Sequence, residues 1–204
     1  MKTRFYQSGF ALLTLIFLLS FQSEVKAQRG SLNWAKDGYQ YYKAAEGGID
    51  ELDTREAGKK TAVVTKEMLT PEGKTPLAVS GFAFSEDGNK VLIFTNTKRV
   101  WRYNTRGDYW IYDRTAKTLK QLGKGKPVSS LMFTKISPDG TKAAYVSEHN
   151  LYVEDLASGD IKPLTTDGSS KLINGTFDWA TRRNLIAATA SAGRRIASWS
   201  LTGK

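Results

Sequence analysis

Few side chains in this chain are of the types that carry out chemistry. Its 204 residues include no cysteine and one histidine, His149, which lies in a Glu-His-Asn turn between two predicted strands. A lone histidine is more often a surface turn residue than a base or a metal ligand. The sequence has no G-x-S-x-G elbow to present a nucleophilic serine. We therefore expect no catalytic residue, no metal site and no cofactor within these residues.

Arg102 is the cation with the most distinctive surroundings, because Trp101 and Tyr103 flank it. An arginine between aromatic residues suits nucleic-acid binding, and the formal net charge is +10. The basic residues are nevertheless spread along the whole chain, which favours a solvated surface and no nucleic-acid partner. An Arg-Gly-Asp tripeptide at 106–108 and a glycosylation sequon at 174–176 are too short to indicate a function.

A recurring Asp-Gly turn defines the elements that must position any such residue. The chain reads WAKDG, FSEDG, ISPDG and a weaker ASAG, and the glycines lie 50, 52 and 53 residues apart: Gly38, Gly88, Gly140 and Gly193. A basic residue and a strand-like run follow the turn, as in KVLIFT and KAAYVS, and a later strand closes each unit. This pattern predicts an all-β fold, a partial β-propeller of about three to four antiparallel four-stranded blades. Asp before Gly is ordinary turn chemistry, so we interpret these turns as structural, not as calcium loops.

We place the blades at residues 31–64, 77–122 and 128–164, and an incomplete fourth begins near residue 172. Residues 65–70, before Pro71, are the one helical candidate. The following apolar residues are expected to form the core strands: Phe82, Phe84, Leu92, Phe94, Ile111, Met132, Phe133, Ala144, Val146, Leu151 and Val153.

The first 27 residues indicate export. Lys2 and Arg4 precede an apolar run at 10–21, and Val25-Lys26-Ala27 places small residues at the −3 and −1 sites of a cleavage position. The alternative is an uncleaved membrane anchor, but about 12 apolar residues are fewer than the roughly 20 that a spanning helix needs. We expect a signal peptide at 1–27, a periplasmic or secreted product and no stable membrane span.

Three segments carry a family resemblance: VWRYNTRGDYWIYD at 100–113, LYVEDLASGDIKPLTTDG from 151, and INGTFDW at 173–179. Together they resemble the N-terminal β-propeller region of dipeptidyl peptidase IV, in the prolyl oligopeptidase family of serine peptidases. The resemblance implies a propeller that filters peptide substrates on their way to an α/β-hydrolase domain. It also implies that Arg102 is a substrate-binding residue that helps hold a backbone carbonyl oxygen of the peptide, a task that suits the donor-rich guanidinium. Without the hydrolase domain, the chain is expected to be inactive and to meet a peptide substrate only as part of a full-length enzyme.

The sequence departs from that family after Trp179. The family continues with Val-Tyr-Glu-Glu-Glu, whose carboxylates hold the amino terminus of the substrate, whereas residues 180–184 here read ATRRN. One inserted nucleotide in the codon of Ala180 is compatible with restoring the family motif, so a frameshift is favoured over divergence. We divide the chain into a signal peptide at 1–27, a partial propeller at 28–179 and a degenerate, frameshift-like start of a further blade at 180–204. The alternative function is a stand-alone periplasmic propeller-type module that binds another protein.

Overall fold

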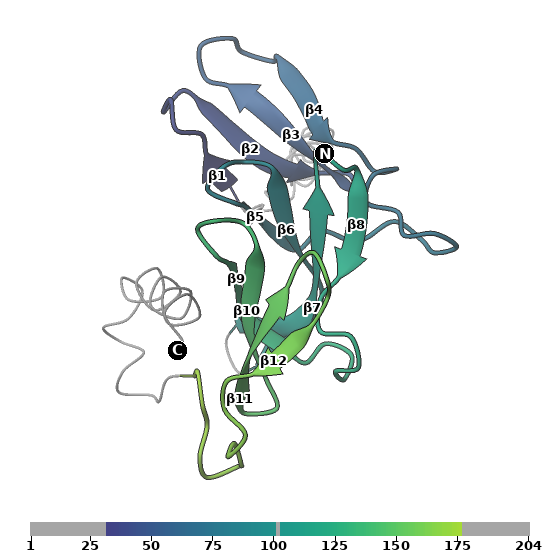
Figure 1. Cartoon of the computed structure of the whole chain (residues 1–204). Helices are drawn as coiled ribbons and strands as arrows, with labels where there is room; N and C mark the ends of the chain where they lie inside the picture. The colour runs from purple at the N-terminus through teal and green to yellow at the C-terminus, as the bar shows by residue number, and fades with distance from the viewer. Residues whose placement is uncertain (1–31, 101–102, 177–204) are drawn as a thin grey trace, which may run out of the picture.

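The protein is all-β in a computed structural model, which describes residues 32–100 and 103–176. Its strands form three consecutive groups of four (Figure 1). The first group is β1 (Leu32–Trp34), β2 (Gln40–Ala45), β3 (Gly48–Asp53) and β4 (Lys60–Val64). The second is β5 (Gly81–Phe84), β6 (Lys90–Val100), β7 (Tyr103–Asp113) and β8 (Thr118–Gln121). The third is β9 (Leu131–Ile136), β10 (Lys142–Ser147), β11 (Asn150–Asp155) and β12 (Ile161–Pro163).

All strand pairs are antiparallel, and each group lies within one of the predicted blades. We call the groups blades 1, 2 and 3. Blades 2 and 3 are further joined into one hydrogen-bonded sheet, because β7 pairs with β9 at Arg106 opposite Met132 and Gly107 opposite Leu131. The prediction of consecutive four-stranded blades is confirmed. The hydrogen-bonded pairing of β7 with β9, which joins blades 2 and 3, was not predicted. Within 32–100 and 103–176 no helix is long and apolar enough to cross a membrane.

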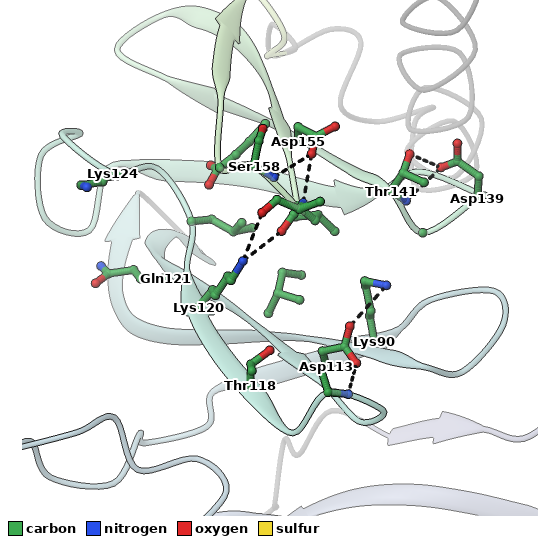
Figure 2. A pocket seen from close by; sticks show the side chains of 18 residues that line it. Lys90, Asp113, Thr118, Lys120, Gln121, Lys124, Asp139, Thr141, Asp155 and Ser158 are labelled. Atoms are coloured by element: carbon green, nitrogen blue, oxygen red, sulfur yellow. Dashed lines mark hydrogen bonds and ion pairs between the residues drawn. The ribbon is translucent and has the colours of Figure 1, made fainter.

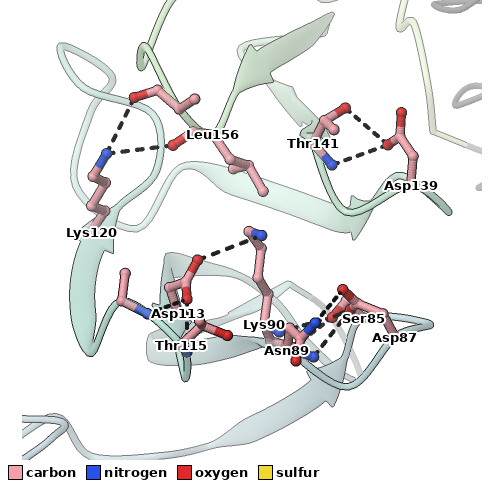
Figure 3. Close-up of polar contacts among 12 residues, drawn as sticks. Ser85, Asp87, Asn89, Lys90, Asp113, Thr115, Lys120, Asp139, Thr141 and Leu156 are labelled. Carbon is pink, nitrogen blue, oxygen red and sulfur yellow. Dashed lines mark hydrogen bonds and ion pairs between the residues drawn. The ribbon is translucent and has the colours of Figure 1, made fainter.

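The Asp-Gly turns are held by carboxylates. In blade 2 the Ser85 hydroxyl donates to Asp87 Oδ1 over 2.5 Å and accepts the amide N–H of Lys90 over 2.9 Å (Figure 3). Ser137 and Asp139 repeat this contact in blade 3, again over 2.5 Å. Hydrogen bonds to the charged form lower the pKa of Asp87 to about 2 and also lower the pKa of Asp139, with the serine hydroxyl as the main cause in each case. These carboxylates thus serve the turns themselves, as the sequence indicated.

Blade 2 is buried on both faces, because it lies between two other blades. On β6, Val91 and Ile93 have no exposed surface on one face, and Leu92 is 5% exposed on the other. The first face packs against blade 1 in a cluster of Ile49, Val64, Leu69, Phe82, Val91, Ile93, Trp110 and Tyr112. The second face packs against blade 3 in a cluster of Leu92, Tyr109, Ile111, Leu122, Leu131, Ala143 and Tyr145.

The predicted core was therefore incomplete. Five of the expected residues are buried: Phe82, Leu92, Ile111, Val146 and Val153. The other six are only partly buried: Phe84, Phe94, Met132, Phe133, Ala144 and Leu151. Phe133 has φ +55°, beside a register shift between β9 and β10, so it leaves the strand alternation. The residues on the first face of β6 and β7, Val91, Ile93, Trp110 and Tyr112, were missed because alternation marks only one buried face.

The helical candidate at residues 65–70 is wrong. The segment forms turns, in which the amide N–H of Leu69 donates to the carbonyls of Thr65 and Lys66 over 3.3 and 3.2 Å. Pro71 follows at once, so too few residues are available to propagate a helix. The segment does connect β4 of blade 1 to β5 of blade 2, as expected.

Candidate functional site

The hairpin of β6 and β7 is the longest in the described structure and flanks Arg102. Each strand has 11 residues, whereas β10 and β11 at the same place in blade 3 have 6 each. Val100 pairs with Tyr103 at the far end. The two residues that join them, Trp101 and Arg102, lie outside the described residues. The role of Arg102 therefore stays a prediction, and what the structure describes is the hairpin that leads to it.

Two compensating bulges change the direction of the hairpin where it leaves the core. Thr95 lies opposite Asp108 and Lys98 opposite Arg106, so β6 has one residue more than β7 between these pairs. The next shift, before Arg99, adds one residue to β7. Asn96, in the first bulge, has φ +45°. Bulges of this kind bend a strand and redirect the side chains beyond them.

Three polar side chains fix the first bulge. Asp108 accepts the Nδ2–H of Asn96 and the amide N–H of Ser129, each over 2.7 Å. The Ser129 hydroxyl in turn donates to the carbonyl oxygen of Asn96 over 2.7 Å, and Ser129 is 2% exposed. We call Asn96, Asp108 and Ser129 the hairpin clamp. The clamp links both strands of the hairpin to the loop before β9, so the hairpin cannot turn independently of blade 3.

Gly107 allows this close approach. An added Cβ there would collide with the ring of Phe94 and lie 2.6 Å from the carbonyl oxygen of Thr95. Two residues of the Arg-Gly-Asp tripeptide thus have structural roles. Gly107 packs against β6, and Asp108 belongs to the hairpin clamp.

A cavity of about 870 Å³ opens between blades 2 and 3, beside β8 (Figure 2). Lys120 crosses it, with Nζ 3.5 Å from the carbonyl oxygen of Leu156 and 3.3 Å from that of Ala157. On its rim the Lys90 and Asp113 side chains pair over 3.5 Å. The amide N–H groups of Ala116 and Thr115, together with Lys90, lower the pKa of Asp113. These contacts hold the turns and the two blades together.

Glu154 is the most deeply buried charged side chain at this cavity, at 4% exposed. Its Oε2 accepts the amide N–H of Gly123 over 2.8 Å and the hydroxyl of Tyr145 over 3.0 Å. Burial raises the pKa of Glu154 against the opposing effect of these two donors, and burial also raises the pKa of Tyr145. Since Gly123 follows blade 2 and Tyr145 belongs to blade 3, Glu154 connects the two blades.

His149 lies where the sequence placed it, in the two-residue turn between β10 and β11. Glu148 and His149 have φ +47° and +66°, the left-handed conformations that such a turn needs. The carbonyl oxygen of His149 accepts the amide N–H of Asn174 over 3.0 Å. Among the residues that the structure describes, no group of three or more His, Asp or Glu side chains could hold a metal ion.

Asn96, Ser129 and Glu154 were missed by sequence reasoning, and Asp108 was noticed only in a tripeptide. The hydrogen-bond partners of these residues lie 12 to 33 residues away in the chain, except for Tyr145, which is closer in the chain to its acceptor Glu154. No local pattern marks such a pair.

The fold and this hairpin define a propeller-type protein of consecutive four-stranded blades. Residues 85–192, more than half of the chain, match the family described as the dipeptidyl peptidase IV (DPP IV) N-terminal region. The chain belongs to this family.

Curated relatives agree with this assignment. The chain is 28% identical over 160 residues to a probable dipeptidyl-aminopeptidase B of Aspergillus niger, covering 76% of this chain and 17% of that protein. It is 31% identical over 141 residues to a probable dipeptidyl-aminopeptidase B of Arthroderma gypseum, covering 69% of this chain and 14% of that one. The chain thus spans about a sixth of the length of the curated relatives it matches.

A solved structure supports the fold. Dipeptidyl peptidase 4 of Porphyromonas gingivalis superimposes with a TM-score of 0.56 at 20% identity, over 69% of this chain and 20% of that one. At this identity the likeness concerns the architecture alone.

Proposed function

We propose that this chain supplies the substrate-gating propeller of an exported dipeptidyl peptidase IV-like serine peptidase, and that the hydrolysis itself depends on a hydrolase domain outside these residues. Family membership supports the peptidase context. The sequence offers no nucleophile elbow, and its one histidine, His149, lies in the turn between β10 and β11, so no catalytic triad is assigned to it. The part played by the chain would then be to admit and orient peptides.

The observation that carries this proposal is the clamped β6–β7 hairpin. Its strands extend well beyond the core of blade 2, and its clamp bonds of 2.7 Å tie it to blade 3. A binding residue is most effective on a support that loses little freedom when the ligand arrives. The hairpin provides such a support for the segment that contains Arg102.

Arg102 is the proposed substrate ligand. Its guanidinium would donate to a backbone carbonyl oxygen of the peptide, as the resemblance of the Trp101-Arg102 segment implies. The family's paired glutamates have no counterpart at residues 180–184, where two arginines stand instead. Recognition of the substrate's amino terminus is therefore not assigned to this chain.

Export is the second part of the proposal and rests on residues 1–27. Their basic start, apolar run and Val-Lys-Ala ending have the order of a cleaved signal peptide. The product would act in the periplasm or outside the cell.

Peptide binding to the purified chain tests the role of Arg102. The probe is a short Xaa-Pro peptide with a free amino terminus, and binding is measured by titration calorimetry. Loss of a charged donor in Arg102→Gln should weaken binding roughly tenfold. Lys162→Gln, which removes an exposed cation on β12, serves as the matched control. Equal affinities for the wild type and Arg102→Gln would refute the assignment.

A further inference from the structure

The far part of the β6–β7 hairpin carries an unbalanced positive charge. Residues 96–107 contain four cations and no carboxylate: Lys98, Arg99, Arg102 and Arg106 are the cations. Lys98 and Arg106 are exposed, and they lie directly opposite each other in the strand register. Directly opposed like charges repel each other across a strand pair and weaken it. Local structure alone therefore gives no reason to place them there.

The nearest carboxylate in sequence forms no ion pair with either cation. Asp108 is two residues from Arg106, but its two oxygens accept from Asn96 and Ser129 over 2.7 Å each. Neither Lys98 nor Arg106 forms an ion pair with any other residue that the structure describes. The two cations remain available to a carboxylate from another molecule.

We propose that Lys98 and Arg106 form a carboxylate-binding pair that makes acidic peptides the preferred substrate class. The proposal rests on the proposed function, which brings a peptide to this hairpin. An arginine fork and a lysine ammonium both make charge-assisted hydrogen bonds to carboxylates. Tyr103, 65% exposed where it pairs with Val100 at the end of the same hairpin, offers an apolar surface to the peptide further along.

The pair is preorganised for this role. The two bulges and the hairpin clamp fix the strand register, so Lys98 and Arg106 stay opposite each other without a ligand. A carboxylate that binds between them removes their repulsion and adds its own attraction. The gain is electrostatic, so added salt should weaken it.

Two matched peptides test the preference. They share a free amino terminus and a proline in the second position, and they differ only in two glutamates that replace two glutamines further along. The wild-type chain should bind the glutamate peptide about five- to tenfold more tightly at low salt. The double variant Lys98→Gln with Arg106→Gln should bring this ratio close to one and leave the affinity for the glutamine peptide unchanged. Lys162→Gln should keep the wild-type ratio.

A charge-reversed variant guards against a folding artefact. With Lys98→Glu and Arg106→Glu, a peptide with two lysines in place of the two glutamates should become the preferred ligand. Arg102→Gln should weaken both original peptides equally and keep their ratio. If Arg102→Gln has no effect while the ratio persists, the proposed role of Arg102 fails and the carboxylate-binding pair stands.

Equal wild-type affinities for the two original peptides would overturn the proposal. So would a glutamate preference that survives in the double glutamine variant, because other cations would then be responsible. A single-stranded oligonucleotide that binds through the same two residues more tightly than the glutamate peptide would also overturn it, since nucleic acid would then be the favoured ligand.

Discussion

Replacing Glu154 by glutamine tests how blades 2 and 3 are held together. The side chain is 4% exposed and accepts from Gly123 and Tyr145 over 2.8 and 3.0 Å. Glutamine keeps an acceptor oxygen for both donors and has no charge to bury. We therefore expect Glu154→Gln to be as stable as the wild type, or more stable, at neutral pH.

Tyr145→Phe is the companion change and should act in the opposite direction. It removes one of the two donors to Glu154 and leaves a buried carboxylate with the Gly123 amide alone. A hydrogen bond to a charged group contributes about 1.5–3 kcal/mol, so this variant should lose about that much free energy of unfolding at neutral pH. The stacked contact of Tyr145 with Tyr152, at 5.9 Å between ring centroids, is compatible with phenylalanine.

The dependence on pH follows from the raised pKa of Glu154. A carboxyl group whose folded pKa is raised stabilises the fold fully below its unfolded pKa, near 4.3, and loses that contribution as pH rises through the folded pKa. The aspartates of the turns, such as Asp87 and Asp139, have lowered pKa values, so they stabilise the fold at higher pH and lose this contribution as pH falls. The difference between the wild type and Glu154→Gln above about pH 4.3 thus isolates Glu154.

Urea unfolding between about pH 4 and pH 8, followed by tryptophan fluorescence, measures these effects. Trp110 is 8% exposed in the core between blades 1 and 2 and will report the transition. The free energy of unfolding of Glu154→Gln should exceed that of the wild type by a margin that grows as pH rises. If glutamine costs about 2 kcal/mol or more at neutral pH and the gap stays constant with pH, the reasoning about the buried carboxylate is wrong.

Three further predictions concern catalysis, export and the hairpin. The purified chain should release no dipeptide from a chromogenic Xaa-Pro substrate, because it has no nucleophile elbow; turnover above that of a mock preparation would contradict this. A reporter fused to residues 1–27 should cross the inner membrane and be cleaved after Ala27, and an intact cytoplasmic reporter would count against export. Gly107→Ala should speed amide hydrogen exchange in β6 and β7, because the new Cβ meets Phe94 and the Thr95 carbonyl. Gly88→Ala is the control, since the space around Gly88 is open and the change should affect only its own turn. Equal amide exchange in β6 and β7 in the two variants would refute the packing argument.

The sequence carried a large part of the candidate site's scaffold. The start of β6 was predicted as the strand-like run KVLIFT of the second blade, and the residues of the hairpin carry the family resemblance. The hairpin clamp could not be predicted from the sequence, since Asp108 and Ser129 are separated by 21 residues and meet only when β7 lies beside the loop before β9. The opposed charges of Lys98 and Arg106 also depend on two bulges that no local pattern marks.

The sequence by itself determined the turns and the succession of four-stranded blades. Ser85, Asp87 and Lys90 lie within six consecutive residues, so the hydrogen bonds of the turn form from neighbours whatever the rest of the chain does. The tertiary structure decided which strand faces are buried and how the blades are joined. Val91 and Leu92 are adjacent residues on opposite faces of β6, and both are buried because a separate blade covers each face. Glu154 reaches Gly123 across 31 residues for the same reason, since only the packing of blade 3 against blade 2 brings that carboxylate to its donor.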